Sequence, residues 1–340
     1  MAEYKGIKGF TIQSLASDPT NLVAGQIWYN TATTVIKGYV AGAGAWSSGG
    51  NTNNKNQGTG CLGIQTAAMY GGGKTGSPTV TTSVDTSETY NGTAWTETND
   101  LTTAVYANGA FGSVTAGASF GGRNAANTLQ DRTEEYNGTC WSTVPGTLNT
   151  ARAVISGCGT QTAGLFCGGG PSPPTGKNMY AESYNGTTWT EEADLNVGRM
   201  GIQNAGTTTA ALAIAGVPPD TGSDYTELWN GTSWTEVNDL TTPRAEMAGC
   251  GITTAAMIAG GQSGPGEPRV ANVEQYNGTS WTEVADIATA RKAYPGGATS
   301  SPSGAFCIWG GADTPTSNAG TTATEEWNDP VLSTVTFTAS

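Results

Sequence analysis

Residues 276–281, which read Tyr-Asn-Gly-Thr-Ser-Trp, limit the possible folds of this chain more than any other feature, because the stretch recurs. Related copies occupy residues 90–95, 136–141, 184–189 and 229–234, and a broken copy begins at Trp327. Asn-Gly between runs of aromatic and β-branched residues predicts a type I′ hairpin, in which both turn residues take positive φ. Since one hairpin alone is only marginally stable, a copy every 45 to 51 residues indicates units that pack against one another.

Each unit has four parts that run from apolar to polar. The first begins near an Arg and ends in a turn rich in Gly and Thr, and the second is a short apolar run that usually closes with two glycines. The third is an acidic and aromatic strand, and the fourth alternates Trp, Thr and Glu after the Asn-Gly turn. The apolar runs occupy residues 67–73, 116–122, 163–169, 210–216, 255–261 and 305–311. Four antiparallel strands whose innermost members are apolar form the blade of a β-propeller, so six runs predict six blades.

The apolar run, the paired glycines and the spaced Tyr and Trp resemble the kelch repeat, which is 45 to 50 residues long. The resemblance covers about residues 55 to 328. The chain departs from the pattern in its shorter Tyr-to-Trp spacing and in Ala215, which replaces one glycine. The resemblance implies an all-β fold, a six-bladed kelch-like β-propeller, preceded here by a short N-terminal β-hairpin segment.

Closure of the ring involves one end of the chain, because the sixth unit lacks its fourth strand and an open edge would invite aggregation. We expect residues 39–48, which contain Trp46, to close blade six. The alternative is the C-terminal strand at residues 331–340, in which Val335 and Phe337 alternate with polar residues. The predicted organisation is therefore an attachment segment with a hairpin at 1–38, a propeller at 39–330 and a C-terminal strand at 331–340.

Composition excludes several classes of function. A net charge of −13 argues against nucleic acid and anionic membranes as partners. No apolar run reaches 18 residues and the first 13 residues lack the apolar core of a signal peptide, so we expect neither membrane insertion nor export, and synthesis in a host cytoplasm. The chain has no His, which removes the commonest general base and the usual metal ligands. We therefore expect no enzyme activity, no cofactor and no metal.

The cysteines and the repeated carboxylate pairs have structural interpretations. The six cysteines show no metal-ligand spacing, and we interpret them as small buried fillers rather than disulfides. Carboxylate pairs such as Glu134-Glu135 recur at equivalent strand positions, and we interpret them as a solvated blade edge.

Repeated cations point to a binding face. In a propeller the loops between second and third strands share one face with the connections between blades, and here those loops vary in sequence whereas the opposite turns are uniform. Variation on one face of a fixed scaffold is typical of recognition. The candidate ligand-binding residues are Arg152, Arg199, Arg244 and Arg291 at the connections and Arg123, Lys177 and Arg269 in the loops. They favour an anionic or hydroxyl-rich glycan. In the alternative interpretation each connection arginine pairs with a blade glutamate and links neighbouring blades.

The N-terminal segment gives the functional hint. Residues 12–19, 25–30 and 36–39, followed by Trp46, resemble the opening module of bacteriophage tail-fibre-type and other virion proteins. The resemblance implies a virion structural protein on the exposed surface of the particle, of the tail-fibre or receptor-binding type. Residues 1–38 would dock to other virion proteins, the propeller would bind a host cell-surface glycan or protein, and the chain would form a homo-oligomer. The alternatives are a phage-associated glycan-degrading enzyme and an intracellular kelch-type adaptor.

Overall fold

The computed structural model describes residues 12–22, 25–41, 44–75, 82–170, 179–217, 223–263, 268–292, 296–298, 306–312, 320–328 and 332–337. These residues form β-strands and no helix, so no helix within the described ranges could span a membrane. The chain divides into two compact units. Unit 1 comprises Met1–Ala45 and Asp329–Ser340, and unit 2 comprises Trp46–Asn328.

Unit 2 contains six four-stranded sheets among its described residues. The first sheet consists of β5 (Gly60–Ile64), β6 (Ala67–Gly71), β9 (Ser87–Tyr90) and β10 (Trp95–Thr98), and the second of β11 (Gly109–Ser113), β12 (Ala116–Phe120), β13 (Thr133–Tyr136) and β14 (Trp141–Val144). The third consists of β15 (Gly157–Thr160), β16 (Ala163–Cys167), β17 (Ala181–Tyr184) and β18 (Trp189–Glu191), and the fourth of β19 (Gln203–Gly206), β20 (Ala211–Gly216), β21 (Ser223–Trp229) and β22 (Trp234–Val237). The fifth consists of β23 (Ala248–Ile252), β24 (Ala255–Ala259), β25 (Val273–Tyr276) and β26 (Trp281–Val284), and the sixth of β27 (Gly296–Ala298), β28 (Phe306–Trp309), β29 (Thr324–Asn328) and β4 (Ala45–Ser48). A two-strand ladder of β7 (Lys74–Thr75) and β8 (Thr82–Ser83) extends a loop of the first sheet.

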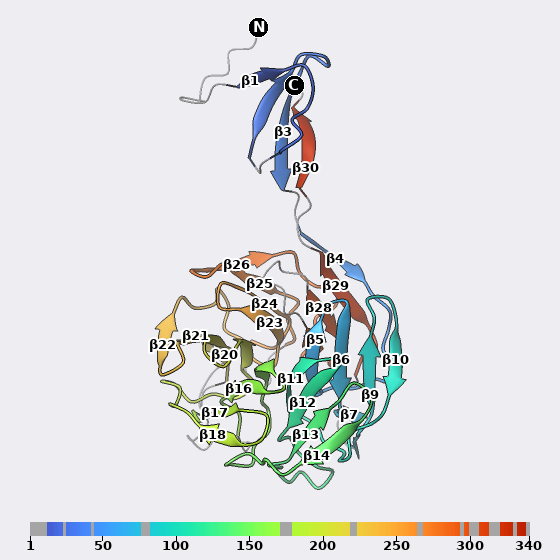
Figure 1. Ribbon diagram of the computed structural model, residues 1–340, viewed down its shortest axis with the longest axis vertical. Helices are drawn as coiled ribbons and strands as arrows, with labels where there is room; N and C mark the ends of the chain where they lie inside the picture. The colour runs from blue at the N-terminus through green and yellow to red at the C-terminus, as the bar shows by residue number, and fades with distance from the viewer. Residues whose placement is uncertain are drawn as a thin grey trace. The chain divides into compact units, whose positions relative to one another are not determined.

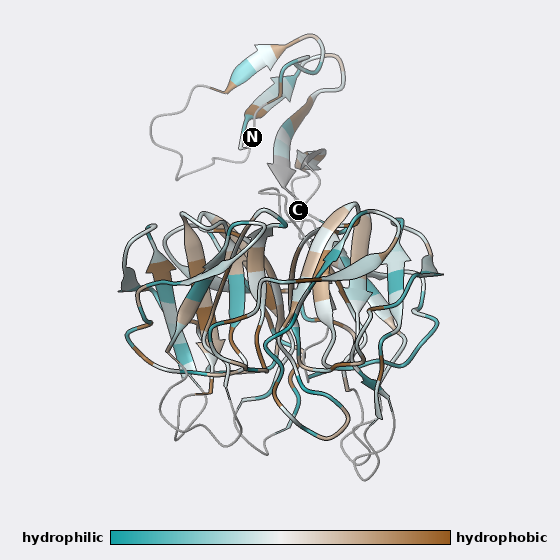
Figure 2. Ribbon diagram, turned by 60° about the horizontal axis from the view of Figure 1, so that its bottom comes forward, coloured by the Kyte–Doolittle hydropathy of each residue, from teal (hydrophilic) through white to brown (hydrophobic). Residues whose placement is uncertain are grey.

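The six sheets surround a common axis (Figure 1). Each innermost strand contacts the next, in the order β5, β11, β15, β19, β23 and β27, and β27 contacts β5. Hydrophobic residues lie along the strands of the sheets (Figure 2). An all-β propeller is therefore confirmed, with its core between successive sheets.

The N-terminal side of the chain supplies the outer strand of the sixth sheet. This strand is β4, and the Trp46 ring packs edge-on against Phe306 and Trp327, with centroid separations of 5.8 and 5.6 Å. The Trp46 Nε1–H also donates to the carbonyl of Ala285, 2.8 Å away. The strand is shorter than the expected residues 39–48, because residues 39–41 continue a strand of unit 1.

Unit 1 is a four-stranded sheet in the order β1 (Gln13–Leu15), β2 (Ile27–Asn30), β3 (Val35–Ala41) and β30 (Leu332–Phe337). β2 and β3 are antiparallel, as expected for the N-terminal hairpin, and β1 runs parallel to β2. The expected division into a segment 1–38 and a separate C-terminal strand is wrong, because β30 pairs with β3 from Ile36 to Ala41. The Asp18 carboxylate accepts hydrogen bonds from Trp28, Asn30 and Lys37, which holds the connection between β1 and β2 against the sheet.

The repeated turns differ in detail from the predicted type I′ geometry. In the fifth sheet Tyr276 pairs directly with Trp281, so the loop has four residues, and only Gly278 has positive φ. The Asn277 Oδ1 accepts the backbone N–H groups of Thr279 and Ser280, both at 2.9 Å. The prediction of positive φ at Asn is wrong because the asparagine caps the turn with its side chain instead. The same two bonds recur at Asn91, Asn137, Asn185 and Asn230.

Close approach between neighbouring sheets explains glycine in the inner strands. A Cβ built on Gly164 would lie 2.0 Å from Cζ of Phe111, which belongs to the preceding sheet. A Cβ on Gly117 would lie 2.6 Å from Cδ2 of Leu62 in the same way. A large side chain on a strand of one sheet thus fills the space that a glycine leaves on a strand of the next sheet.

Candidate functional site

The four connection arginines are buried ion pairs and offer no surface to a ligand. Arg199 lies 2.6 Å from the carboxylate of Glu227, with side-chain exposures of 0% and 2%. Arg152 pairs with Glu182, Arg244 with Glu274 and Arg291 with Glu325, and these side chains are buried as well. Their expected role in ligand binding is therefore corrected, because a guanidinium that is enclosed and already paired with a carboxylate is not accessible.

Each of these pairs links two successive sheets, as the alternative interpretation proposed. The carbonyl of Arg244 accepts the N–H of Gly216 in the fourth sheet at 2.9 Å, while its guanidinium pairs with Glu274 in the fifth. The second carboxylate oxygen of Glu274 accepts the N–H of Thr241 on the same connection, at 2.8 Å. Equivalent backbone bonds join Gly122 to Arg152, Gly169 to Arg199 and Gly261 to Arg291.

A buried glutamate occurs in all six sheets, although two of them lack the arginine. The six are Glu88, Glu134, Glu182, Glu227, Glu274 and Glu325, each at most 5% exposed. In the second sheet Arg132, which precedes Glu134 on the same strand segment, supplies the cation at 3.1 Å. In the first sheet Glu88 accepts hydrogen bonds from Asn53, Asn54 and the Tyr70 hydroxyl. The expectation of a solvated edge is therefore wrong for these residues.

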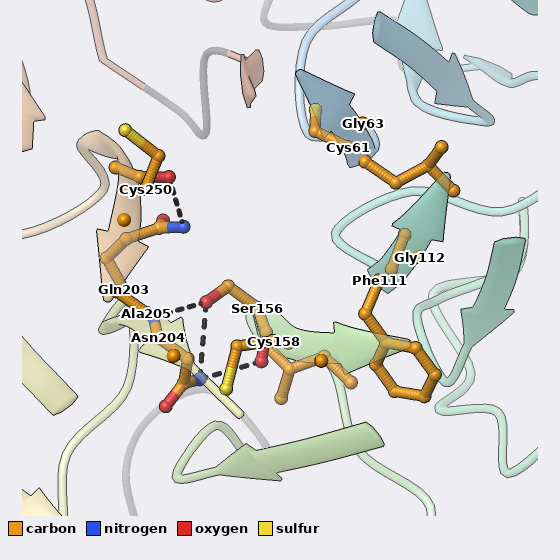
Figure 3. A pocket seen from close by; sticks show the side chains of 18 of the residues that line it. Cys61, Gly63, Phe111, Gly112, Ser156, Cys158, Gln203, Asn204, Ala205 and Cys250 are labelled. Carbon is orange, nitrogen blue, oxygen red and sulfur yellow. Dashed lines mark hydrogen bonds between the residues drawn. The ribbon is translucent and has the colours of Figure 1, made fainter. Parts of the chain in front are cut away.

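The propeller axis contains a cavity of about 250 Å³, lined by innermost strands (Figure 3). Cys250, Gln203 and Asn204 lie on the wall opposite Cys61 and Gly112 in this view. Ser156 Oγ accepts the backbone N–H of Asn204 at 2.7 Å, and the Gln203 amide donates to the carbonyl of Gly249 at 3.0 Å. The described residues that line it carry no charge.

Thiols are part of the cavity lining, through Cys61, Cys158 and Cys250. Burial raises the pKa of Cys158 to about 12, so this thiol stays protonated at neutral pH. None of the six cysteines, all of which lie in the described ranges, forms a disulfide, and these ranges contain no group of three side chains placed to hold a metal ion. Four of the cysteines are buried, as predicted for small fillers, whereas Cys61 and Cys140 are only partly buried.

A belt of backbone hydrogen bonds runs around the axis from the first sheet to the fifth, just before the innermost strands begin, at the face that carries the connections between sheets. Its members are Gly58, Ala107, Val154, Gly201 and Glu246, all with positive φ between 53° and 69°. The backbone N–H groups of the last four members each donate to the carbonyl of the preceding member, at 2.6, 2.8, 3.3 and 3.1 Å in turn. This left-handed conformation is costly for Ala, Val and Glu, and the four bonds hold these residues in it.

Around the belt, on the same face, lies a cluster that we call the cationic cluster: Lys74, Tyr106, Arg123 and Asn127. The Lys74 ammonium lies 5.3 Å from the Tyr106 ring centroid, and the Tyr106 hydroxyl donates to Asn127 Oδ1 at 2.7 Å. Arg123 Nη1 donates to the same oxygen at 3.1 Å and to the Asn127 carbonyl at 3.2 Å. Four side chains thus hold two positive charges close to one aromatic ring, and the Lys74 charge lies over that ring.

Glu246 of the belt is influenced by further cations on this face. Burial raises the pKa of its carboxyl group, while the charges of Lys292, Lys74 and Arg269 lower it. Burial also lowers the pKa of Lys74. Among the loop residues expected to bind ligand, Arg123 is in the cationic cluster, Arg269 donates to the carbonyl of Ala312, and Lys177 lies outside the described residues. Sequence reasoning missed Tyr106 and Glu246, which lie in connections rather than loops.

Comparison with known proteins adds information on the fold. No protein-family model matches the chain, and no curated protein sequence matches it. Among solved structures, the chain is similar to one titled "Structure of YjhT", with a TM-score of 0.64 and 13% identity, over 81% of this chain and 95% of that one. At this identity the likeness shows the propeller fold alone.

Proposed function

We propose that this protein is a bacteriophage virion protein of the tail-fibre or receptor-binding type. Unit 1 attaches it to other virion proteins, and the propeller binds a component of the host surface through the face that carries the cationic cluster. The proposal draws on the resemblance of residues 12–46 to virion proteins, and the likeness to a solved propeller adds only the scaffold.

The cationic cluster is the observation that carries the binding role. Most described arginines form internal ion pairs with glutamates. Lys74 and Arg123 are not paired with a carboxylate within the described ranges. On a chain of net charge −13, two such cations beside Tyr106 form a local site of opposite sign. Local positive potential attracts anionic groups. The uncharged axial cavity favours binding over catalysis.

Unit 1 offers a surface suited to attachment. The strand register places Ile27, Tyr29, Ile36, Val335 and Phe337 on one face of its sheet. Ile27 is 41% and Phe337 46% exposed. Apolar side chains gathered on one face of a small sheet are typical of a surface that is covered by another protein.

Mass spectrometry of purified particles, combined with immunogold labelling, tests the proposal. We expect peptides of this chain in particles purified by density gradient, and gold label on their exposed surface after labelling with an antibody against unit 2. Absence of the chain from purified particles, or its recovery from cell lysate in complexes with host cytoplasmic proteins alone, contradicts the proposal and favours an intracellular adaptor.

A further inference from the structure

Arg123 differs from the arginines that link the sheets. Its Nη1 donates to two oxygens of Asn127, but its Nη2 is buried and has no hydrogen-bond acceptor among the residues that the structure describes. The residue is only 8% exposed. A charged donor without an acceptor in such a place costs free energy, and an unsatisfied group of this kind requires an explanation. By contrast, Arg132, Arg152, Arg199, Arg244 and Arg291 each pair with a carboxylate.

The groups around Arg123 are fixed before any ligand binds. Tyr106 and Arg123 exchange two backbone hydrogen bonds, of 2.9 and 2.8 Å, which hold the aromatic ring and the guanidinium in register. Asn127, in a left-handed conformation with φ of 62°, bonds to both side chains. The Lys74 ammonium adds a second charge over the ring. A site that is ordered in advance binds without the entropy cost of ordering it.

We propose that the cationic cluster is a subsite for one carboxylated sugar residue. The carboxylate accepts from the Lys74 ammonium, the buried Arg123 guanidinium adds the second positive charge, and the sugar ring packs beside Tyr106. A hydrogen bond between two charged groups is stronger than a neutral one, and shielding from water strengthens it further. The inference rests on the proposed function, since it names the chemistry of the host component.

An acidic saccharide fits this cluster better than an acidic peptide. One aromatic ring with a cation over it matches a single acidic ring, which presents one carboxylate and an apolar face.

Calorimetry with the full chain tests the subsite. The probes are an oligogalacturonate, its uncharged methyl ester, and an oligoglutamate with the same number of carboxylates. We expect the oligogalacturonate to bind, and the ester to bind roughly ten- to hundredfold more weakly, as for loss of a hydrogen bond to a charged group. Arg123→Gln should weaken binding of the acid by a similar factor and leave binding of the ester unchanged. Lys74→Gln provides a second variant, and Lys55→Gln, at an exposed lysine outside the cluster, is the matched control. Thermal melting of each variant verifies folding.

Four results overturn the subsite: no binding of the acid, equal binding of acid and ester, unchanged binding of the acid by both Arg123→Gln and Lys74→Gln, or tighter binding of the oligoglutamate. The last result identifies an acidic peptide as the ligand. These outcomes are separable from the proposed function. If the chain is in particles but the variants bind as the wild type does, the subsite fails and the function stands. If the chain is absent from particles but binds the acid through Arg123, the function fails and the subsite stands.

Discussion

Arg199 and Glu227 form an ion pair with no access to solvent, in which Nη1 lies 2.6 Å from Oε1. The same guanidinium donates to the carbonyls of Ala213 and Ala215, so its hydrogen-bonding capacity is largely used within the protein. Because the arginine lies on the connection between the third and fourth sheets, the pair couples the two sheets. The chain's repeated arginines thus serve the scaffold and not the ligand.

Removal of one partner tests the role of this pair. We expect Arg199→Met to lower the free energy of unfolding by about 3–5 kcal/mol, because Glu227 would be left buried without its cation. Urea unfolding followed by Trp fluorescence measures the change. The double variant Arg199→Met/Glu227→Leu should recover much of the loss, since both charges are then gone. Equal stability of wild type and Arg199→Met contradicts the structural role.

Glycine in the inner strands is expected to be intolerant of even one added methyl group. Gly164→Ala would place a Cβ 2.0 Å from Phe111, so we expect a loss of about 1–3 kcal/mol in the free energy of unfolding. Phe111→Leu on the Gly164→Ala background should cost less than on the wild type, because the smaller side chain makes room for the methyl group. If the changes in unfolding free energy caused by the two substitutions simply add in the double variant, the two residues do not pack directly against each other.

The repeated turns depend on the asparagine side chain as an acceptor. Asn185 Oδ1 accepts the N–H groups of Thr187 and Thr188, both at 2.9 Å. We expect Asn185→Ala to destabilise the protein by about 0.5–1.5 kcal/mol per bond lost, and Asn185→Asp, which keeps the oxygen, to have little effect. Differential scanning calorimetry of the two variants provides the comparison. If Asn185→Asp lost more stability than Asn185→Ala, the side-chain acceptor would not be what stabilises the turn.

The belt should make stability depend on pH through Glu246. Folding raises the pKa of its carboxyl group above 4.5, so its contribution to stability is full below that value and is lost as pH rises through the folded pKa. Glu246→Gln removes this dependence. We therefore expect the stability of the variant relative to wild type to increase as the pH rises from below 4.5 towards neutrality, measured by urea unfolding at each pH. A relative stability that is constant with pH, or that falls, contradicts this view of the belt.

The propeller could be predicted from the sequence because its signals are local and periodic. The Tyr and Trp on either side of each turn, together with the glycine-closed runs, define one sheet per repeat, and Trp46 marks the strand that completes the sixth sheet. The partner of the C-terminal strand could not be predicted, since Val335 and Phe337 alternate in a way that suits either sheet.

The burial of the six glutamates is indicated by their spacing from the aromatic residues in the sequence. In each repeat the glutamate lies two residues before the buried aromatic residue, as Glu274 does before Tyr276. Side chains two apart on a strand share one face, so the burial of the aromatic ring implies the burial of the glutamate. Its arginine partner then follows from the need to pair a buried charge.

The cationic cluster had no such signal. Lys74, Tyr106 and Arg123 come from three segments that are brought together only by the packing of the first two sheets. The belt could not be predicted either, because the residue types of Ala107, Val154 and Glu246 do not indicate positive φ. Both features depend on how successive sheets pack against one another.

Competition for particle adsorption tests the central claim, that the face carrying the cationic cluster binds the host surface. Host cells are incubated with an excess of purified wild-type chain, with the Lys74→Gln/Arg123→Gln variant, or with Lys55→Gln, and the fraction of particles that adsorb is then counted. We expect wild type and Lys55→Gln to reduce adsorption and the double variant to have little effect. Normal adsorption in the presence of the wild-type chain, or equal inhibition by the double variant, contradicts the claim.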